Sequence, residues 1–184
     1  EMSASLVGSE MCIRDRAIKK GDVAAAKNYL AQAASKKSDA AEINANKAIV
    51  ALAEGNLAEA ESCLSRATSA KNYNEVLGNL NIAKGNYSQA AQNLAGTNTN
   101  SAALAQLLNK DYVSAAQSLS AVAAPDAMTS YLKAVVAARN GENALVLTNL
   151  KEAIAKDSKL KAYAAKDLEF AKLFNDASFQ SLVK

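Results

Sequence analysis

The sequence predicts an all-α protein built from a repeated helical hairpin, and three observations support this fold class. Alanine accounts for 42 of the 184 residues and only nine residues are aromatic, so the apolar content consists of small side chains that suit closely packed helices. One proline and seven glycines are too few for the turns of a sheet protein, which excludes an all-β fold. The third observation is a turn motif that recurs along the chain.

Residues 1–16, EMSASLVGSEMCIRDR, break the alanine-rich texture that begins at Ala17. Residues 6–16 resemble the translation of a sequencing-library transposon adapter. The alternatives are a signal peptide and a native leader, and a signal peptide is disfavoured because the apolar stretch at residues 6–8 is too short and no basic start precedes it. We therefore expect residues 1–16 to be an artefact outside the core, and we expect the native N-terminus to be missing.

Five turn motifs align along the rest of the chain. They begin at Gly21, Gly55, Gly85, Lys110 and Gly141, with spacings of 34, 30, 25 and 31 residues. Five residues after each origin stands a small residue: Ala26, Ala60, Ala90, Ala115 and Val146. Nine residues after each origin stands a leucine: Leu30, Leu64, Leu94, Leu119 and Leu150. Seven residues before the last four origins stand Ala48, Gly78, Ala103 and Ala134. This pattern predicts hairpins whose two helices approach closely and share one apolar face.

Each hairpin has its own start and stop signals. The turn glycine ends the first helix with a backbone conformation that side chains disfavour, and the Asp or Asn that often follows suits the start of the second helix. The unit at Gly21 lacks most of its first helix. The units at Gly85 and Lys110 must have trimmed helices or loops because their spacings are short. Lys110 also replaces the turn glycine.

This pattern resembles the tetratricopeptide repeat, and Ala48, Gly55, Ala60, Leu64 and Ala67 match it best. The resemblance covers residues 17–157 and implies a solenoid, a right-handed superhelix of about five hairpins with the first one truncated. The proline that often closes a unit is absent, as is the large aromatic residue of the first helix. These departures suggest a thin solenoid packed through alanine.

Residues 158–184 have a different periodicity. Every third residue belongs to one set: Asp167, Phe170, Leu173, Asp176, Phe179 and Leu182. The segment resembles the cap that closes some tetratricopeptide arrays, in which Asp caps short helices while Phe and Leu cover the last hairpin. A terminal hairpin needs such a cap because its apolar face has no neighbour. We expect the chain to end at its native C-terminus. Residues 17–184 also resemble, more loosely, the C-terminal repeat region of larger bacterial cell-envelope lipoproteins. This implies an envelope or periplasmic location, with the cytoplasm as the alternative.

Catalytic and metal chemistry find little support. The chain has no histidine, the commonest general base, and its two cysteines cannot complete a four-thiolate zinc site. Cys63 is interpreted as a small packing residue rather than a nucleophile. The carboxylate pairs Glu59/Glu61 and Asp167/Glu169 are two residues apart and point to different helix faces. We expect no enzyme activity, no cofactor and no metal.

Nucleic acid and membrane spans are also disfavoured. The net charge is only +3, and outside residues 1–16 the only arginines are Arg66 and Arg139. No apolar run approaches the roughly 20 residues of a membrane helix.

A partner groove is the remaining hypothesis. The resemblance implies that the first helices line a concave face, with the positions ten, six and three before each turn residue pointing inward. The candidate groove residues are Ile49, Glu75, Asn79, Leu104 and Tyr131, with Arg139 beside them. The alternative is that Ile82, Leu107 and Val135 at such positions join the core. A groove of this kind suits an extended or helical peptide, to which Asn79 would offer a backbone-pairing amide. The sequence predicts a scaffold that binds a protein partner or its own parent domains, and the alternative is a structural spacer in a larger envelope protein. Recognition of a C-terminal carboxylate is disfavoured because the Lys and Asn pattern for it is missing.

Overall fold

The computed structural model describes residues 23–36 and 40–184. These residues form helices joined by turns, with no strand among them. The chain divides into two compact units, Glu1–Asn93 and Leu94–Lys184, and each is described by itself. Residues 1–16, the expected artefact, lie outside the described residues.

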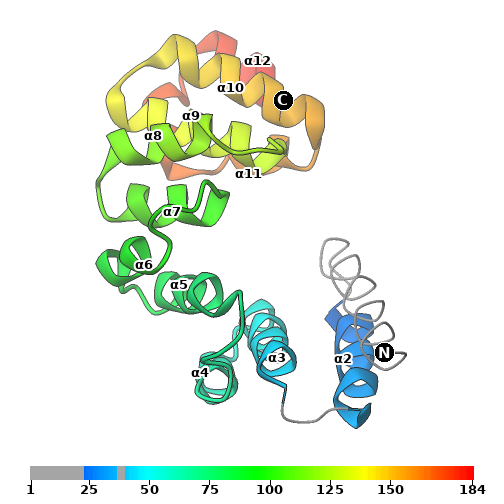
Figure 1. Cartoon of the computed structure of the whole chain (residues 1–184). Coiled ribbons are helices and arrows are strands. Elements are labelled where there is room, and N and C mark those ends of the chain that lie inside the picture. The colour runs from blue at the N-terminus through cyan, green and yellow to red at the C-terminus, as the bar shows by residue number, and fades with distance from the viewer. Residues whose placement is uncertain (1–22, 37–39) are drawn as a thin grey trace. The chain divides into compact units, whose positions relative to one another are not determined.

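The N-terminal unit contains two hairpins and one further helix. Helices α3 (Ala41–Ala53) and α4 (Leu57–Leu64) form the first hairpin, and α5 (Tyr73–Ala83) and α6 (Tyr87–Asn93) form the second. Helix α2 (Val23–Lys36) packs against α3 and occupies the place expected for the second helix of the truncated unit (Figure 1). Helix α5 also contacts both α3 and α4, so the hairpins of this unit stack.

The C-terminal unit contains two hairpins and the cap. Helices α7 (Asn100–Leu108) and α8 (Tyr112–Ser120) form one hairpin, and α9 (Ala127–Asn140) and α10 (Asn143–Lys156) form the other. The cap consists of α11 (Leu160–Ala164), the 3₁₀ helix η1 (Leu168–Leu173) and α12 (Ala177–Val183). Helices α11 and α12 contact α10, while η1 contacts α9.

The four described turns share one geometry. The backbone is left-handed at Gly55, Gly85 and Gly141, with φ of 74°, 79° and 78°, and Lys110 adopts the same conformation with φ of 65°. In each turn the N–H of the following residue donates to the carbonyl five residues earlier, for example Asn56 N to Ala51 O at 2.9 Å. This is the Schellman arrangement that satisfies the last carbonyls of a helix. Asn56 and Asp111 then cap α4 and α8 through their side chains, as the sequence predicts.

The core is built from the repeat positions. The small residues five after each turn are fully buried: Ala26, Ala60, Ala90, Ala115 and Val146. The leucines nine after each turn are buried as well: Leu30, Leu64, Leu94, Leu119 and Leu150. Because these ten positions were derived from turn alignment alone, their burial confirms the hairpin interpretation. The shortened units have short helices, since α6 has 7 residues and α7 and α8 have 9 each, against 14 each in α9 and α10; a short helix also occurs in the Gly55 unit, where α4 has 8 residues.

The cap closes the last hairpin with aromatic side chains. Phe170 and Phe179 are each only 1% exposed, and the half-buried Phe174 packs against the same core. Asp167 accepts from the Glu169 N–H at the start of η1, and Asp176 accepts from the Phe179 N–H at the start of α12. The all-α fold of helical hairpins with a C-terminal cap is therefore confirmed, while the handedness of the superhelix stays a prediction.

Candidate functional site

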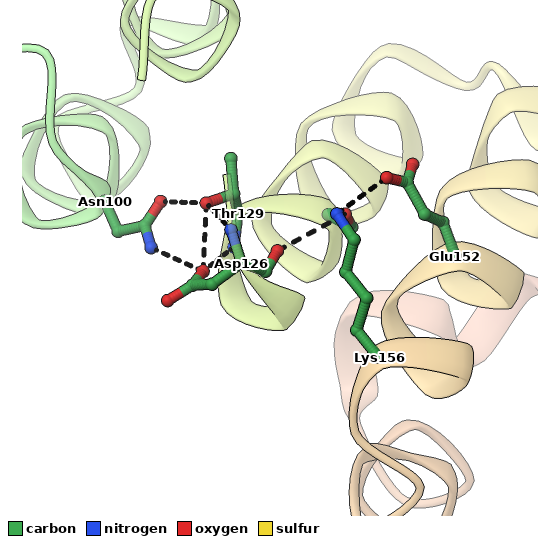
Figure 2. Close-up of polar contacts among 6 residues, drawn as sticks. Asn100, Asp126, Thr129, Glu152 and Lys156 are labelled. Carbon is green, nitrogen blue, oxygen red and sulfur yellow. Dashed lines mark hydrogen bonds and ion pairs between the residues drawn. The ribbon is translucent and has the colours of Figure 1, made fainter. Parts of the chain in front are cut away.

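A polar network fixes the start of α9 in the C-terminal unit. The Asp126 carboxylate accepts from the Thr129 N–H at 2.8 Å and from the Asn100 side-chain amide at 3.0 Å. The Thr129 hydroxyl lies 2.9 Å from both the Asn100 and the Asp126 side-chain oxygens. Figure 2 shows these groups beside Lys156, which contacts Ser130 and pairs with Glu152. The network therefore joins the first turns of α7 and α9 to the last turn of α10.

The surroundings of Asp126 lower the pKa of its carboxyl group. Partial burial acts to raise the pKa of its carboxyl group, but the hydrogen bonds from Thr129 and Asn100 outweigh that effect and lower the pKa below its usual value. The carboxylate stays charged and belongs to a capping box, in which Asp126 and Thr129 bond each other's backbone. The network is a structural device that holds the hairpins in register.

Two further contacts hold η1 against α9. The Tyr131 hydroxyl donates to the Asp167 carboxylate at 2.6 Å, and its ring meets Phe170 edge-on with centroids 5.7 Å apart. About two turns further along α9, Arg139 forms an ion pair with Glu169. Burial raises the pKa of Tyr131 above its ordinary value, and the Asp167 carboxylate raises it further. Tyr131 therefore remains a protonated donor throughout the physiological range.

Two hollows flank Leu168, which lies between these two contacts. One hollow, of about 650 Å³, is lined by Tyr163, Lys166 and Leu168 together with Ala162 and Asp167. The other, of about 430 Å³, contains Leu168 and Lys172 and reaches Tyr112 on α8 and Arg139 on α9. The side chains of Tyr163 and Leu168 are 74% and 81% exposed, although every other Leu and Phe of the cap is buried or half-buried. These two hollows and the exposed apolar residues between them form the candidate site of the C-terminal unit.

The predicted groove residues divide between the two units. In the N-terminal unit, Glu75 is exposed, while Ile49 and Asn79 are half-buried on the neighbouring helices α3 and α5. In the C-terminal unit, Leu104 packs at the edge of the core. Tyr131 is 7% exposed and faces the chain's own cap, and Arg139 is exposed but engaged with Glu169. Of the six predicted groove residues, Tyr131 and Arg139 are the two that contact the same segment, because both bond residues at the start of η1.

Some alternatives left open by the sequence can be compared with the structure. Leu107 and Val135 are buried and join the core, whereas Ile82 is half-buried. Cys63 is buried in the core of the N-terminal unit beside a hollow of about 380 Å³ between α2, α3 and α4. Among the described residues, no group of His, Cys, Asp or Glu side chains could hold a metal ion.

The sequence analysis missed Tyr163 and Leu168. The three-residue periodicity of the cap identifies its buried side chains, and Leu168 falls outside that set. An apolar residue between two acids, in the run Asp167-Leu168-Glu169, is the signal that could have drawn attention to it. Its exposure depends on the contacts that Asp167 and Glu169 make with α9, far away along the chain.

The stacked hairpins, their small-residue contacts and their shared turn geometry define an α-helical repeat protein. The tetratricopeptide repeat family model matches residues 17–80. The match shows that residues 17–80 are similar to tetratricopeptide repeats, and helical hairpins continue beyond this segment. No curated protein and no solved structure matches the chain.

The family match gives the coarse function. Tetratricopeptide repeats generally mediate protein–protein interaction or scaffolding, and they are typically non-catalytic. In the part of the chain that the structure describes, no helix has both the length and the apolar character needed to cross a bilayer.

Proposed function

We propose that the protein is a non-catalytic scaffold that binds a protein or peptide partner along the first helices of its hairpins. The observation that carries this proposal is the continuation of tetratricopeptide-type hairpins on both sides of residue 80, where the family match ends. Helical-repeat folds present extended surfaces that suit protein partners. In this chain, Asn56, Asp111 and Asp126 cap helices.

In the N-terminal unit the proposed surface comprises Ile49 on α3 and Glu75 and Asn79 on α5. These side chains are partly or fully accessible, and no other described group hydrogen-bonds the side-chain amide of Asn79. In the C-terminal unit it comprises Leu104 on α7 and Arg139 on α9, with Tyr131 supporting the edge from beneath η1. The partner is a protein of the same cell or another domain of a larger parent chain, which we place in the bacterial envelope.

Site-specific photo-crosslinking tests this proposal. A photoreactive phenylalanine analogue replaces Asn79 on α5 in one variant and Gln89 in the other. Gln89 lies on the exposed side of the second helix α6 of the same hairpin and is the matched control. We expect a discrete adduct from the variant at position 79 and none from the variant at position 89. Equal adducts from both positions, or none from either, would overturn the proposal.

A structural spacer is the second candidate, and one observation favours it. Tyr131 and Arg139, two of the six predicted groove residues, make their contacts with the chain's own cap. In a spacer, all the predicted groove residues would contact other parts of the same chain rather than a partner. It predicts that Glu75→Lys and Asn79→Ala leave every interaction of the parent protein unchanged.

A further inference from the structure

The cap exposes two large apolar residues, Tyr163 and Leu168. We define the Leu168 surface by five of the residues that line the two hollows on either side of Leu168, namely Tyr112, Tyr163, Lys166, Leu168 and Lys172; the acids Asp167 and Glu169 also line the hollows. Single exposed apolar residues are common on proteins, but neighbouring ones beside hollows indicate an interaction site. Each hollow exceeds the volume of a large apolar side chain and combines a tyrosine, Leu168 and a lysine.

The exposure of Leu168 is enforced by its neighbours. Asp167 is bonded to Tyr131 and to the Glu169 N–H, and Glu169 pairs with Arg139. The next residue, Phe170, is anchored in the core. With both flanking residues held against α9, the Leu168 side chain cannot turn inward. The protein therefore presents it to solvent as a fixed feature.

The charges around this surface point to the chemistry of its partner. The cap segment, residues 158–184, contains five lysines and three carboxylate side chains. All three carboxylates are engaged: Asp167 and Asp176 cap helices, and Glu169 pairs with Arg139. No carboxylate of the described residues forms an ion pair with Lys166 or Lys172, which lie one in each hollow. With five lysines against three side-chain carboxylates, the cap segment keeps an excess of two positive charges, although Asp167 lies beside Lys166 in the first hollow.

We propose that the Leu168 surface binds a short acidic protein segment that carries apolar side chains. The apolar side chains would fill the two hollows beside Leu168, and the acidic ones would meet Lys166 and Lys172. Hollows that accept individual side chains favour a peptide over the flat surface of an anionic membrane. The inference rests on the proposed function as an interaction module and adds a second surface with a defined partner class.

Peptide selection on the whole chain tests the proposal. A displayed random peptide library is selected against the protein, and enriched peptides are labelled and titrated by fluorescence anisotropy. We expect enrichment of peptides that combine Asp or Glu with Leu, Phe or Tyr, with micromolar affinity because the hollows are open. The affinity should fall several-fold when salt is raised from 0.05 M to 0.5 M, roughly the range over which exposed charges become screened.

Three variants locate the binding. Leu168→Glu, and separately Lys166→Glu with Lys172→Glu, should weaken binding at least about ten-fold, because one removes the apolar contact and the other reverses the charge. The matched control is Val113→Glu, which alters a residue that is 70% exposed on α8 of the same unit and lines neither hollow. The affinity of Val113→Glu for the selected peptides should stay within about two-fold of the wild-type value. All substituted residues lie at the surface, so circular dichroism should confirm that the variants fold.

Three outcomes would overturn this inference. Enriched peptides without acidic residues, or peptides that bind Leu168→Glu as well as wild type, would show that the surface does not act as proposed. Binding of phosphatidylserine vesicles that depends on Leu168, without any acidic peptide enriched, would assign the surface to membranes instead. None of these results affects the crosslinking test at position 79, so failure here is distinguishable from failure of the proposed function.

Discussion

Lys110 carries backbone strain that its glycine counterparts avoid. It adopts φ of 65° in a turn where the other hairpins have glycine, and a side chain in this region costs about 1 kcal/mol. We predict that Lys110→Gly raises the free energy of unfolding by about 1 kcal/mol and the melting temperature by about 2–4 °C. Gly55→Ala is the reverse control. The new Cβ would meet no atom within 4 Å, so any decrease in the free energy of unfolding reports backbone strain alone. Unchanged stability of Lys110→Gly in urea titrations would contradict the prediction.

Tyr131 links stability to alkaline pH. Burial and the Asp167 carboxylate hold its pKa above the ordinary value of 10.0, so the folded state binds this proton more tightly than the unfolded state. The stabilisation is complete below pH 10 and declines as the pH rises beyond it, when the unfolded tyrosine ionises. We predict that Tyr131→Phe costs about 1 kcal/mol at pH 8 and that this difference shrinks by pH 11. Urea titrations at the two pH values measure it, and a constant difference would refute the assignment.

At the scale of the element, the cap contributes through its aromatic side chains. Phe179 is 1% exposed and packs against Phe170 and Phe174, with ring centroids 6.1 and 6.0 Å away. We predict that Phe179→Ala lowers the free energy of unfolding by about 3–5 kcal/mol because it leaves a cavity. Leu168→Ala, in the same segment but 81% exposed, should change it by less than about 0.5 kcal/mol. Similar losses in both variants would mean that the cap is not docked as described.

At the scale of the whole molecule, the two units differ in how their cores are filled. The C-terminal core contains Tyr131, Phe170 and Phe179 with several Val and Leu side chains, whereas the N-terminal cores consist largely of alanine. Larger side chains bury more apolar area and therefore stabilise the folded state more. We predict that amides of α9 and α10 exchange with deuterium at least about ten-fold more slowly than those of α3 and α5. Slower exchange in α3 would reverse this ranking of the units.

The sequence could predict the fold further than it could predict the site. The buried Ala60 and Leu64 follow Gly55 at helical spacing, so a local pattern determines which face they occupy. The Leu168 surface instead depends on contacts across long separations, since Tyr131 and Asp167 are 36 residues apart and Arg139 and Glu169 are 30 apart. Helical periodicity carries no information about such pairs. The turn at Lys110 lies between these cases, because its position was predicted while its retained left-handed backbone became visible only in the structure.

The network at the start of α9 also has a kinetic consequence. Asp126 and Thr129 bond Asn100, 26 and 29 residues earlier, and Ser130 bonds Lys156, 26 residues later. Each hairpin turn, by contrast, closes over a few residues and can form on its own. Contacts between distant residues form only after their loops have closed, so this junction should assemble after the transition state for folding. Weakening it would then mainly accelerate unfolding and leave the folding rate almost unchanged. We therefore expect this junction to lengthen the time for which the C-terminal unit stays folded.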